Sequence, residues 1–302
     1  MKKILLILTF IISLQGFAQQ DPQYSLYMFN PLGVNPGYAG SRDAISGVLV
    51  HRSQWVGLDG APTTQVLSIH SPLKNQNMAL GFQLINDKIG PRTTQDISLV
   101  YAYKIKLGKG KLAFGLRGGI LNYQYDWAKI EYRDQDDAIP TTANESFILP
   151  NFDFGIYYNT NKFYAGIALD HLNEAQYNLS VVDTSTSVAK KHINGTATIG
   201  RAFGLTEKLT LKTSAIMRGQ NKQGFLDINA SMLFNNKFLF GITLTSRQTL
   251  IFLTEFNISS QFKIGYAYDY TATQLSNGGS HEVFIGYDFL KHKSQVVSPR
   301  YF

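Results

Sequence analysis

The sequence predicts an all-β protein, a closed antiparallel transmembrane β-barrel of about 14 strands. Apolar side chains recur at every second position along much of the chain, the connections between these stretches alternate between short and long, and the first residues have the order of a secretory signal. The clearest alternation is 261–270, QFKIGYAYDY. As a strand it places small and charged residues on one face and five large residues on the other, namely Phe262, Ile264, Tyr266, Tyr268 and Tyr270.

Comparable segments follow one another through most of the chain, and none has a convincing helical period. Segment 250–258 is ambiguous because both of its faces are mostly apolar. The expected strands are 44–54, 63–71, 77–87, 93–107, 110–124, 151–159, 162–171, 193–202, 207–219, 224–234, 237–246, 250–258, 261–271 and 280–290.

The lengths of the connections predict how these strands lie in a membrane. Counted from the first strand, every even-numbered connection has five residues or fewer, whereas both connections longer than 20 residues, 125–150 and 172–192, are odd-numbered. Outer-membrane barrels have short periplasmic turns, longer external loops and an even number of strands. A sheet in lipid must also close on itself, because every backbone polar group has to be paired there. The pattern favours a barrel whose aromatic-rich face meets lipid, although alternation alone would also suit a secreted β-sandwich.

The N-terminus reads as a targeting segment. Lys2 and Lys3 precede an apolar run at 4–14, and residues 16–18 are suited to cleavage by signal peptidase. We therefore expect export to the outer membrane of a Gram-negative cell. The expected divisions are a signal peptide at 1–18, an N-terminal segment at 19–43 that packs in or plugs the lumen, a barrel at 44–290 and a C-terminal tail at 291–302.

The composition argues against several classes of function. The chain has no Cys, so a disulfide scaffold and a cysteine metal site are excluded. The net charge is +7, but the basic residues are dispersed and do not form the clustered patch that nucleic acid requires. The acidic run at 134–137 lacks the glycine and distal glutamate of an EF-hand loop, and no G-x-S-x-G elbow is present. We expect no enzyme activity, no cofactor and no metal site.

Two sets of residues are candidates for functional contacts. The residues expected in the lumen or its plug are Arg52, Gln54, Trp55, Asp59, Asp96, Arg117, Lys263 and Asp269. Their charges could line a pore, but the mixture of signs favours a closed interior of paired charges. Trp55 would either lock the fold or contact a partner. Those expected on partner-binding loops are Trp127, Tyr132, Arg133 and Tyr177, because aromatic and charged side chains together suit an interface core with a polar rim.

Lys263 and Asp269 lie too far apart along one strand to pair, at about 20 Å for a rise of ~3.3 Å per residue. We therefore expect Asp269 to have a basic partner on the first strand or the N-terminal segment, with Arg52 as the candidate.

The mature chain resembles the PorP/SprF family of Bacteroidetes outer-membrane proteins, which is tied to type IX secretion and gliding motility. The resemblance is carried by DPQYSLYMFNPLGVNPGYAGS at 21–41, HRSQWVGLDGAPTTQVLSIHSPL at 51–73, GYAYDY at 265–270 and SPRYF at 298–302. It implies a non-enzymatic barrel that assists the export or cell-surface attachment of partner proteins, such as adhesins with a type IX C-terminal signal domain. It further implies contact with type IX secretion components and with a peptidoglycan-binding lipoprotein of the OmpA type. The alternative function is an outer-membrane channel or transporter for small solutes.

Overall fold

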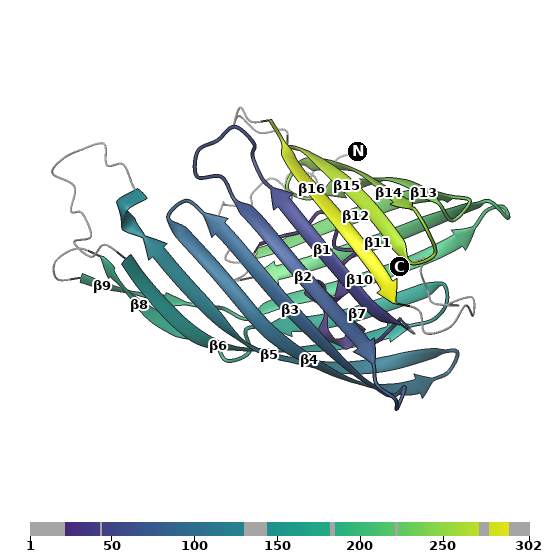
Figure 1. The fold of residues 1–302 in the computed structure, drawn as a ribbon, viewed down its shortest axis with the longest axis horizontal. Helices are drawn as coiled ribbons and strands as arrows, with labels where there is room; N and C mark the ends of the chain where they lie inside the picture. The colour runs from purple at the N-terminus through teal and green to yellow at the C-terminus, as the bar shows by residue number, and fades with distance from the viewer. Residues whose placement is uncertain are drawn as a thin grey trace, which may run out of the picture.

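The computed structural model describes residues 22–42, 44–129, 144–181, 185–220, 223–271 and 278–289. Within these ranges, fourteen strands form a closed barrel in the order β1-β16-β15-β14-β13-β12-β11-β10-β7-β6-β5-β4-β3-β2 (Figure 1). The barrel strands are β1 (Ile45–Ser53), β2 (Thr63–Pro72), β3 (Met78–Ile89), β4 (Arg92–Leu107), β5 (Gly110–Asp126), β6 (Asn144–Asn159), β7 (Phe163–Asp170), β10 (Asn194–Gly204), β11 (Leu209–Gln220), β12 (Gln223–Phe234), β13 (Phe238–Thr245), β14 (Thr249–Asn257), β15 (Phe262–Thr271) and β16 (Ser280–Phe289). The predicted fold class is confirmed.

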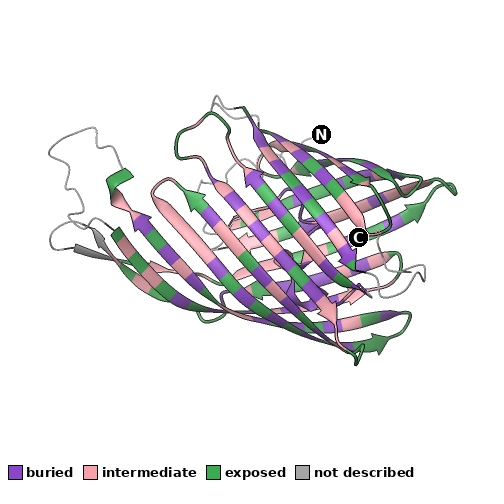
Figure 2. Ribbon diagram, in the orientation of Figure 1, coloured by how far each residue is buried: buried purple, intermediate pink, exposed green. Residues whose placement is uncertain are grey.

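Neighbouring strands are antiparallel all round the barrel, and the seam closes where β1 pairs with β16 from Ile45–Phe289 to Ser53–His281. Side chains alternate between outside and inside, which gives the banded burial pattern of Figure 2. On β15, Ile264 is 38% exposed on the outer face whereas Ala267 on the inner face is 0% exposed. The outer face is apolar and the inner face is packed, as the sequence predicts.

The two ends of the barrel differ. At one end, here called the turn end, the connections are 73–77, 108–109, 160–162, 205–208, 235–237 and 258–261. Asn235 and Asn236 both have positive φ, of 49° and 54°, which is the backbone twist that a tight hairpin between right-twisted strands requires. The opposite end, here called the loop end, carries the longer connections, including 54–62 and 171–193.

The structure differs from the prediction where the sequence suggested two long loops. β5 and β6 continue to Asp126 and from Asn144, and they stay paired to those ends. The 172–192 stretch contains a separate two-stranded sheet of β8 (Gln176–Val181) and β9 (Ser185–Lys190). The helical elements are short: α2 (Pro31–Val34), η1 (Pro36–Tyr38) and η2 (Trp127–Lys129). No helix within the described ranges is long and apolar enough to cross a membrane.

Residues 22–42, here called the N-terminal segment, run through the lumen from the loop end to the turn end. Leu26 and Phe29 are buried in one core cluster with inward-facing residues of β14. Ile251 and Leu253 belong to that cluster and are 3% and 0% exposed. This packing explains why both faces of segment 250–258 are apolar: one meets the outside of the barrel and the other meets the N-terminal segment.

Candidate functional site

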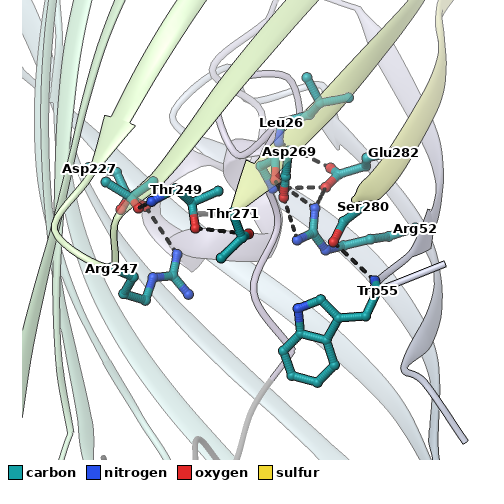
Figure 3. A network of polar contacts seen from close by, with 12 residues as sticks. Leu26, Arg52, Trp55, Asp227, Arg247, Thr249, Asp269, Thr271, Ser280 and Glu282 are labelled. Atoms are coloured by element: carbon teal, nitrogen blue, oxygen red, sulfur yellow. Dashed lines mark hydrogen bonds and ion pairs between the residues drawn. The ribbon is translucent and has the colours of Figure 1, made fainter. Parts of the chain in front are cut away.

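The candidate site is the lumen together with the N-terminal segment, which three groups of contacts hold in place. At the loop end, Arg52 on β1 donates to Asp269 Oδ2 at 2.7 Å and to Glu282 Oε2 at 2.9 Å (Figure 3). Ser25 joins this network, since its backbone N–H reaches Glu282 at 2.8 Å and its hydroxyl donates to Asp269 at 2.7 Å. The backbone N–H of Leu26 also donates to Glu282, at 3.1 Å. Arg52 is therefore the basic partner expected for Asp269.

The second group lies halfway along the lumen, where Asn35 bridges two strands. Its side-chain amide donates to the carbonyl oxygens of Ile156 on β6 and Ile167 on β7, at 3.0 and 3.2 Å. Its side-chain oxygen accepts from Gly37 N at 2.8 Å and so shapes the η1 turn.

Glycines on three strands make room for this turn. A Cβ on Gly115 would lie 2.2 Å from Gly37 N, and a Cβ on Gly155 would lie 2.2 Å from the side-chain oxygen of Asn35. A Cβ on Gly166 would lie 2.7 Å from the side-chain nitrogen of Asn35. Any side chain at these positions would collide with the N-terminal segment, so the barrel wall is shaped to receive it.

The third group fixes the N-terminal segment at the turn end. Arg42 donates twice to Asp288 on β16, at 2.8 and 3.0 Å, and donates to the hydroxyl of Tyr38 at 3.1 Å. Lys104 on β4 donates to the backbone oxygen of Gly40 at 2.7 Å. The Arg42–Asp288 pair is almost completely buried, and buried pairs of this kind are costly to break.

Between these groups, Arg117 on β5 connects the wall to the N-terminal segment. It donates to Asp153 on β6 at 3.0 Å and to the backbone oxygen of Leu32 at 2.5 Å. Asp153 also accepts from Asn151 at 3.1 Å and from the backbone N–H of His171 at 2.9 Å. Above this network, at the loop end, lies a cavity of about 140 Å³ whose lining includes Gly33 and Val34 of the N-terminal segment.

The other expected lumen residues take different positions. Asp96 is buried on the inner face of β4, and Lys263 is half-buried on the inner face of β15. Gln54 and Trp55 are half-buried on the 54–62 connection, where the backbone N–H of Trp55 donates to Ser280 Oγ at 3.2 Å. The indole of Trp55 points away from the Arg52 network (Figure 3). Asp59 is exposed on the same connection instead of being buried in the lumen, because this loop extends beyond the strands.

Two of the expected partner-loop residues, Trp127 and Tyr177, lie in a projection at the loop end, formed by the ends of β5 and β6 and the β8–β9 hairpin. Tyr177 stacks on Tyr123 with ring centres 5.0 Å apart, and Trp127 stacks on Tyr125 at 5.1 Å. The hydroxyls of Tyr125 and Tyr177 are 2.7 Å apart. Trp127 and Tyr177 thus hold this projection together. Tyr132 and Arg133 lie outside the described residues.

Sequence reasoning missed six residues that hold the N-terminal segment: Ser25, Asn35, Arg42, Asp153, Glu282 and Asp288. Three of them could have been found by the rule that picked Asp269, because they are acidic and occupy inward positions on alternating strands. Asn35 gave no such signal, since it lies in a Pro- and Gly-rich stretch without periodicity.

The polar groups of this lumen bind the N-terminal segment and join strands of the wall. Among the described residues, no group of three or more His, Cys, Asp or Glu side chains is placed to hold a metal ion. The buried hydroxyl of Tyr27 lies 3.0 Å from Ser214 Oγ, so this phenol is hydrogen-bonded to the wall. Among the buried ion pairs, Arg42–Asp288 joins the N-terminal segment to the wall, whereas Arg52–Asp269, Arg52–Glu282 and Arg117–Asp153 join strands of the wall to one another.

Solved structures with a similar fold are outer-membrane proteins of low sequence identity. The CymD monoaromatic hydrocarbon channel superposes with a TM-score of 0.51 at 10% identity, covering 87% of this chain and 93% of that chain. Omp33 of Acinetobacter baumannii gives 0.47 at 7% identity, with 82% and 99% covered. BamA of Haemophilus ducreyi, lacking POTRA domains 1–3, gives 0.44 at 8% identity, with 82% and 70% covered. These likenesses concern the fold alone.

At the level of sequence, no curated protein matches the chain. The family described as "Type IX secretion system membrane protein PorP/SprF" matches residues 16–287, which is most of the chain. The match includes the N-terminal segment and nearly the whole barrel. The chain therefore belongs to the PorP/SprF family of type IX secretion system membrane proteins.

Proposed function

We propose that this protein assists the export or cell-surface attachment of a partner protein, as a non-enzymatic accessory barrel of the type IX machinery. The observation that carries the proposal is the filled lumen. The N-terminal segment is tied to the wall by Arg42 at one end and by Ser25 at the other, with Asn35 between them. A barrel built around a fixed internal segment is suited to holding a partner rather than to passing solute.

The loop end is proposed to face the cell exterior, because short turns of such barrels lie in the periplasm. The projection built from β5, β6 and the β8–β9 hairpin then stands on the outer surface. Its side includes exposed apolar residues, with Ile148 68% and Val188 60% exposed. Apolar side chains raised on a rigid projection are suited to contact with another protein. The proposed partner at this surface is an exported adhesin or its type IX C-terminal signal domain.

The turn end is proposed to face the periplasm, where it could contact other type IX components and an OmpA-type peptidoglycan-binding lipoprotein. Its connections are short and five of the six contain a lysine, at positions 74, 109, 162, 208 and 237. This end therefore carries a rim of lysine residues. We assign no residue of it to a named partner.

The function is tested by deleting the gene and identifying the proteins that disappear from the cell surface. Loss of one or a few large surface proteins, restored by the intact gene, is the expected result. An unchanged set of surface proteins would contradict the secretion role. Purification of the tagged barrel from outer membranes should recover the same proteins as bound chains.

The alternative function, a channel for small solutes, is tested separately with purified protein in planar bilayers. The bonded N-terminal segment predicts that the parent protein has little steady conductance. Steady, large conductance of the parent would contradict a closed lumen and favour the channel.

A further inference from the structure

The cavity at the loop end has the size of a single side chain. At about 140 Å³ it resembles the cavity of ~150 Å³ that accepts benzene in an engineered protein interior. Gly33 and Val34 of the N-terminal segment line it on one side. Its other walls come from strands on both sides of the lumen, for example from Thr94 on β4 and Thr196 on β10. A whole sugar chain or a folded peptide would not enter, but one protruding group would.

The charges around the cavity are unequal. Four carboxylates line it, from Asp87, Asp96, Asp153 and Asp170, against three cationic side chains, from Arg117, Lys191 and Arg218. The formal balance is 3 − 4 = −1 with His171 neutral. Arg218 also serves Asp227 outside the lining, so a bound cation would bring the lining closer to neutrality, and buried charge of one sign without a partner is costly.

Two of the three cations already have carboxylate partners. Arg117 pairs with Asp153 at 3.0 Å, and Arg218 pairs with Asp227 at 2.6 Å. The third, Lys191, lies 5.6 Å from the centre of the Tyr123 ring. An anionic ligand would therefore compete with protein carboxylates for donors that are already used.

Asp96 is the group that points to a ligand. It is 9% exposed on the inner face of β4, it lines the cavity, and its Oδ1 atom is buried without a hydrogen-bond partner among the described residues. A buried carboxylate oxygen that accepts no hydrogen bond is unfavourable, and a ligand that brings N–H donors removes the penalty.

From this geometry we propose that the cavity binds the guanidinium group of an arginine side chain presented by the exported partner. A guanidinium carries one positive charge, offers five N–H donors in a plane and stacks on aromatic rings. The cavity supplies the free oxygen of Asp96 and the rings of Tyr24 and Phe225 in its lining. This assignment rests on the proposed function for the source of the arginine, but the binding itself can be tested without any partner.

The test is a ligand-observed NMR titration of the folded, full-length barrel in zwitterionic detergent micelles. N-acetyl-arginine amide is the probe, since it carries the side chain without free charged termini. The expected result is saturable binding with a dissociation constant of about 1 mM, as for a single-group contact. N-acetyl-norleucine amide should not bind, and N-acetyl-arginine should bind more weakly because its free carboxylate adds a negative charge near Asp96.

Variants separate this site from general electrostatic attraction. Asp96→Asn keeps the shape and removes the charge, so binding should weaken at least tenfold. Asp59→Asn is the matched control, because it makes the same charge change on an exposed loop, and it should bind like the parent. Thr196→Phe should abolish binding by filling the cavity without touching the charge of Asp96. Folding of each variant is checked by its heat-modifiable migration on SDS gels.

Equal binding of the arginine and norleucine amides, or unchanged binding in both Asp96→Asn and Thr196→Phe, would overturn the proposal. Absence of saturable binding to the folded parent would overturn it too, by showing that the cavity holds only water. These outcomes are distinct from failure of the secretion role, which is judged by surface proteins in the deletion strain.

Discussion

Glu282 is the residue whose replacement should loosen the N-terminal segment most directly. It is 0% exposed on β16 and accepts from three donors: the backbone N–H groups of Ser25 and Leu26, and the guanidinium of Arg52. We consider Glu282→Gln, which preserves the shape of the side chain but removes the charge and replaces one acceptor oxygen with an NH2 group.

The expected cost follows from those three bonds. Only one oxygen remains, so at least one buried donor loses its acceptor, which costs about 1–3 kcal/mol. The bonds that remain lose the strengthening that an ionised acceptor provides, about 1 kcal/mol more. A total of about 3 kcal/mol corresponds to about a 100-fold change in an equilibrium constant. Arg52 keeps its ion pair with Asp269 at 2.7 Å, so the barrel itself should stay closed.

The assay is hydrogen–deuterium exchange followed by mass spectrometry on the folded barrel, read from peptides within 22–34. Exchange at Ser25 and Leu26 should accelerate about 100-fold in Glu282→Gln. Glu207→Gln, on the exposed 205–208 turn, is the matched control and should exchange like the parent. Acceleration below about threefold in a correctly folded Glu282→Gln protein would refute the view that this carboxylate holds the N-terminal segment.

Three further predictions concern the same molecule. Gly115→Val should displace residues 35–38 and raise their exchange, whereas Gly118→Val should not, because a Cβ at Gly118 meets only the Phe152 ring at 3.7 Å. Because the chain has no cysteine, single-cysteine variants can report which end of the barrel faces the cell exterior. An impermeant maleimide should label Pro22→Cys at the loop end but not Lys74→Cys at the turn end in intact cells. The reverse labelling pattern would show that the turn end faces the exterior. Tyr177→Ala should leave barrel stability unchanged but reduce the amount of surface-held partner, as judged by quantitative surface proteomics, because it removes three aromatic contacts of the projection.

The barrel could be predicted from sequence because its determinants are local. Period-two alternation sets the face of each side chain, so Asp269 and Arg52 could both be placed inside before their contact was known. Both lie near the loop end, on β1 and β15, which flank β16, so their long and short side chains meet across one strand. The same rule places Glu282 and Asp288 inside, but it does not rank one inward carboxylate above another.

The path of the N-terminal segment could not be predicted in this way, because its determinants are far apart in sequence. The turn at Asn35 fits only because Gly115, Gly155 and Gly166 lack side chains on three separate strands. A glycine within a strand pattern signals a close backbone approach, but it does not say what approaches. The β8–β9 hairpin was missed for another reason, since the β9 sequence STSVAK has no regular alternation of apolar and polar residues to pair with β8.

The contacts at the two ends of β16 have a consequence for how the lumen is filled. Glu282 and Asp288 lie on one strand, and they bind the N-terminal segment through Ser25 and Arg42 respectively. Glu282 also faces Arg52 directly across the β1–β16 seam. These acceptors occupy their positions relative to β1 only when the last strand has paired with the first. Docking of the N-terminal segment and closure of the barrel therefore stabilise one another, and a change that weakens either Glu282 or Asp288 should weaken the seam as well as the segment.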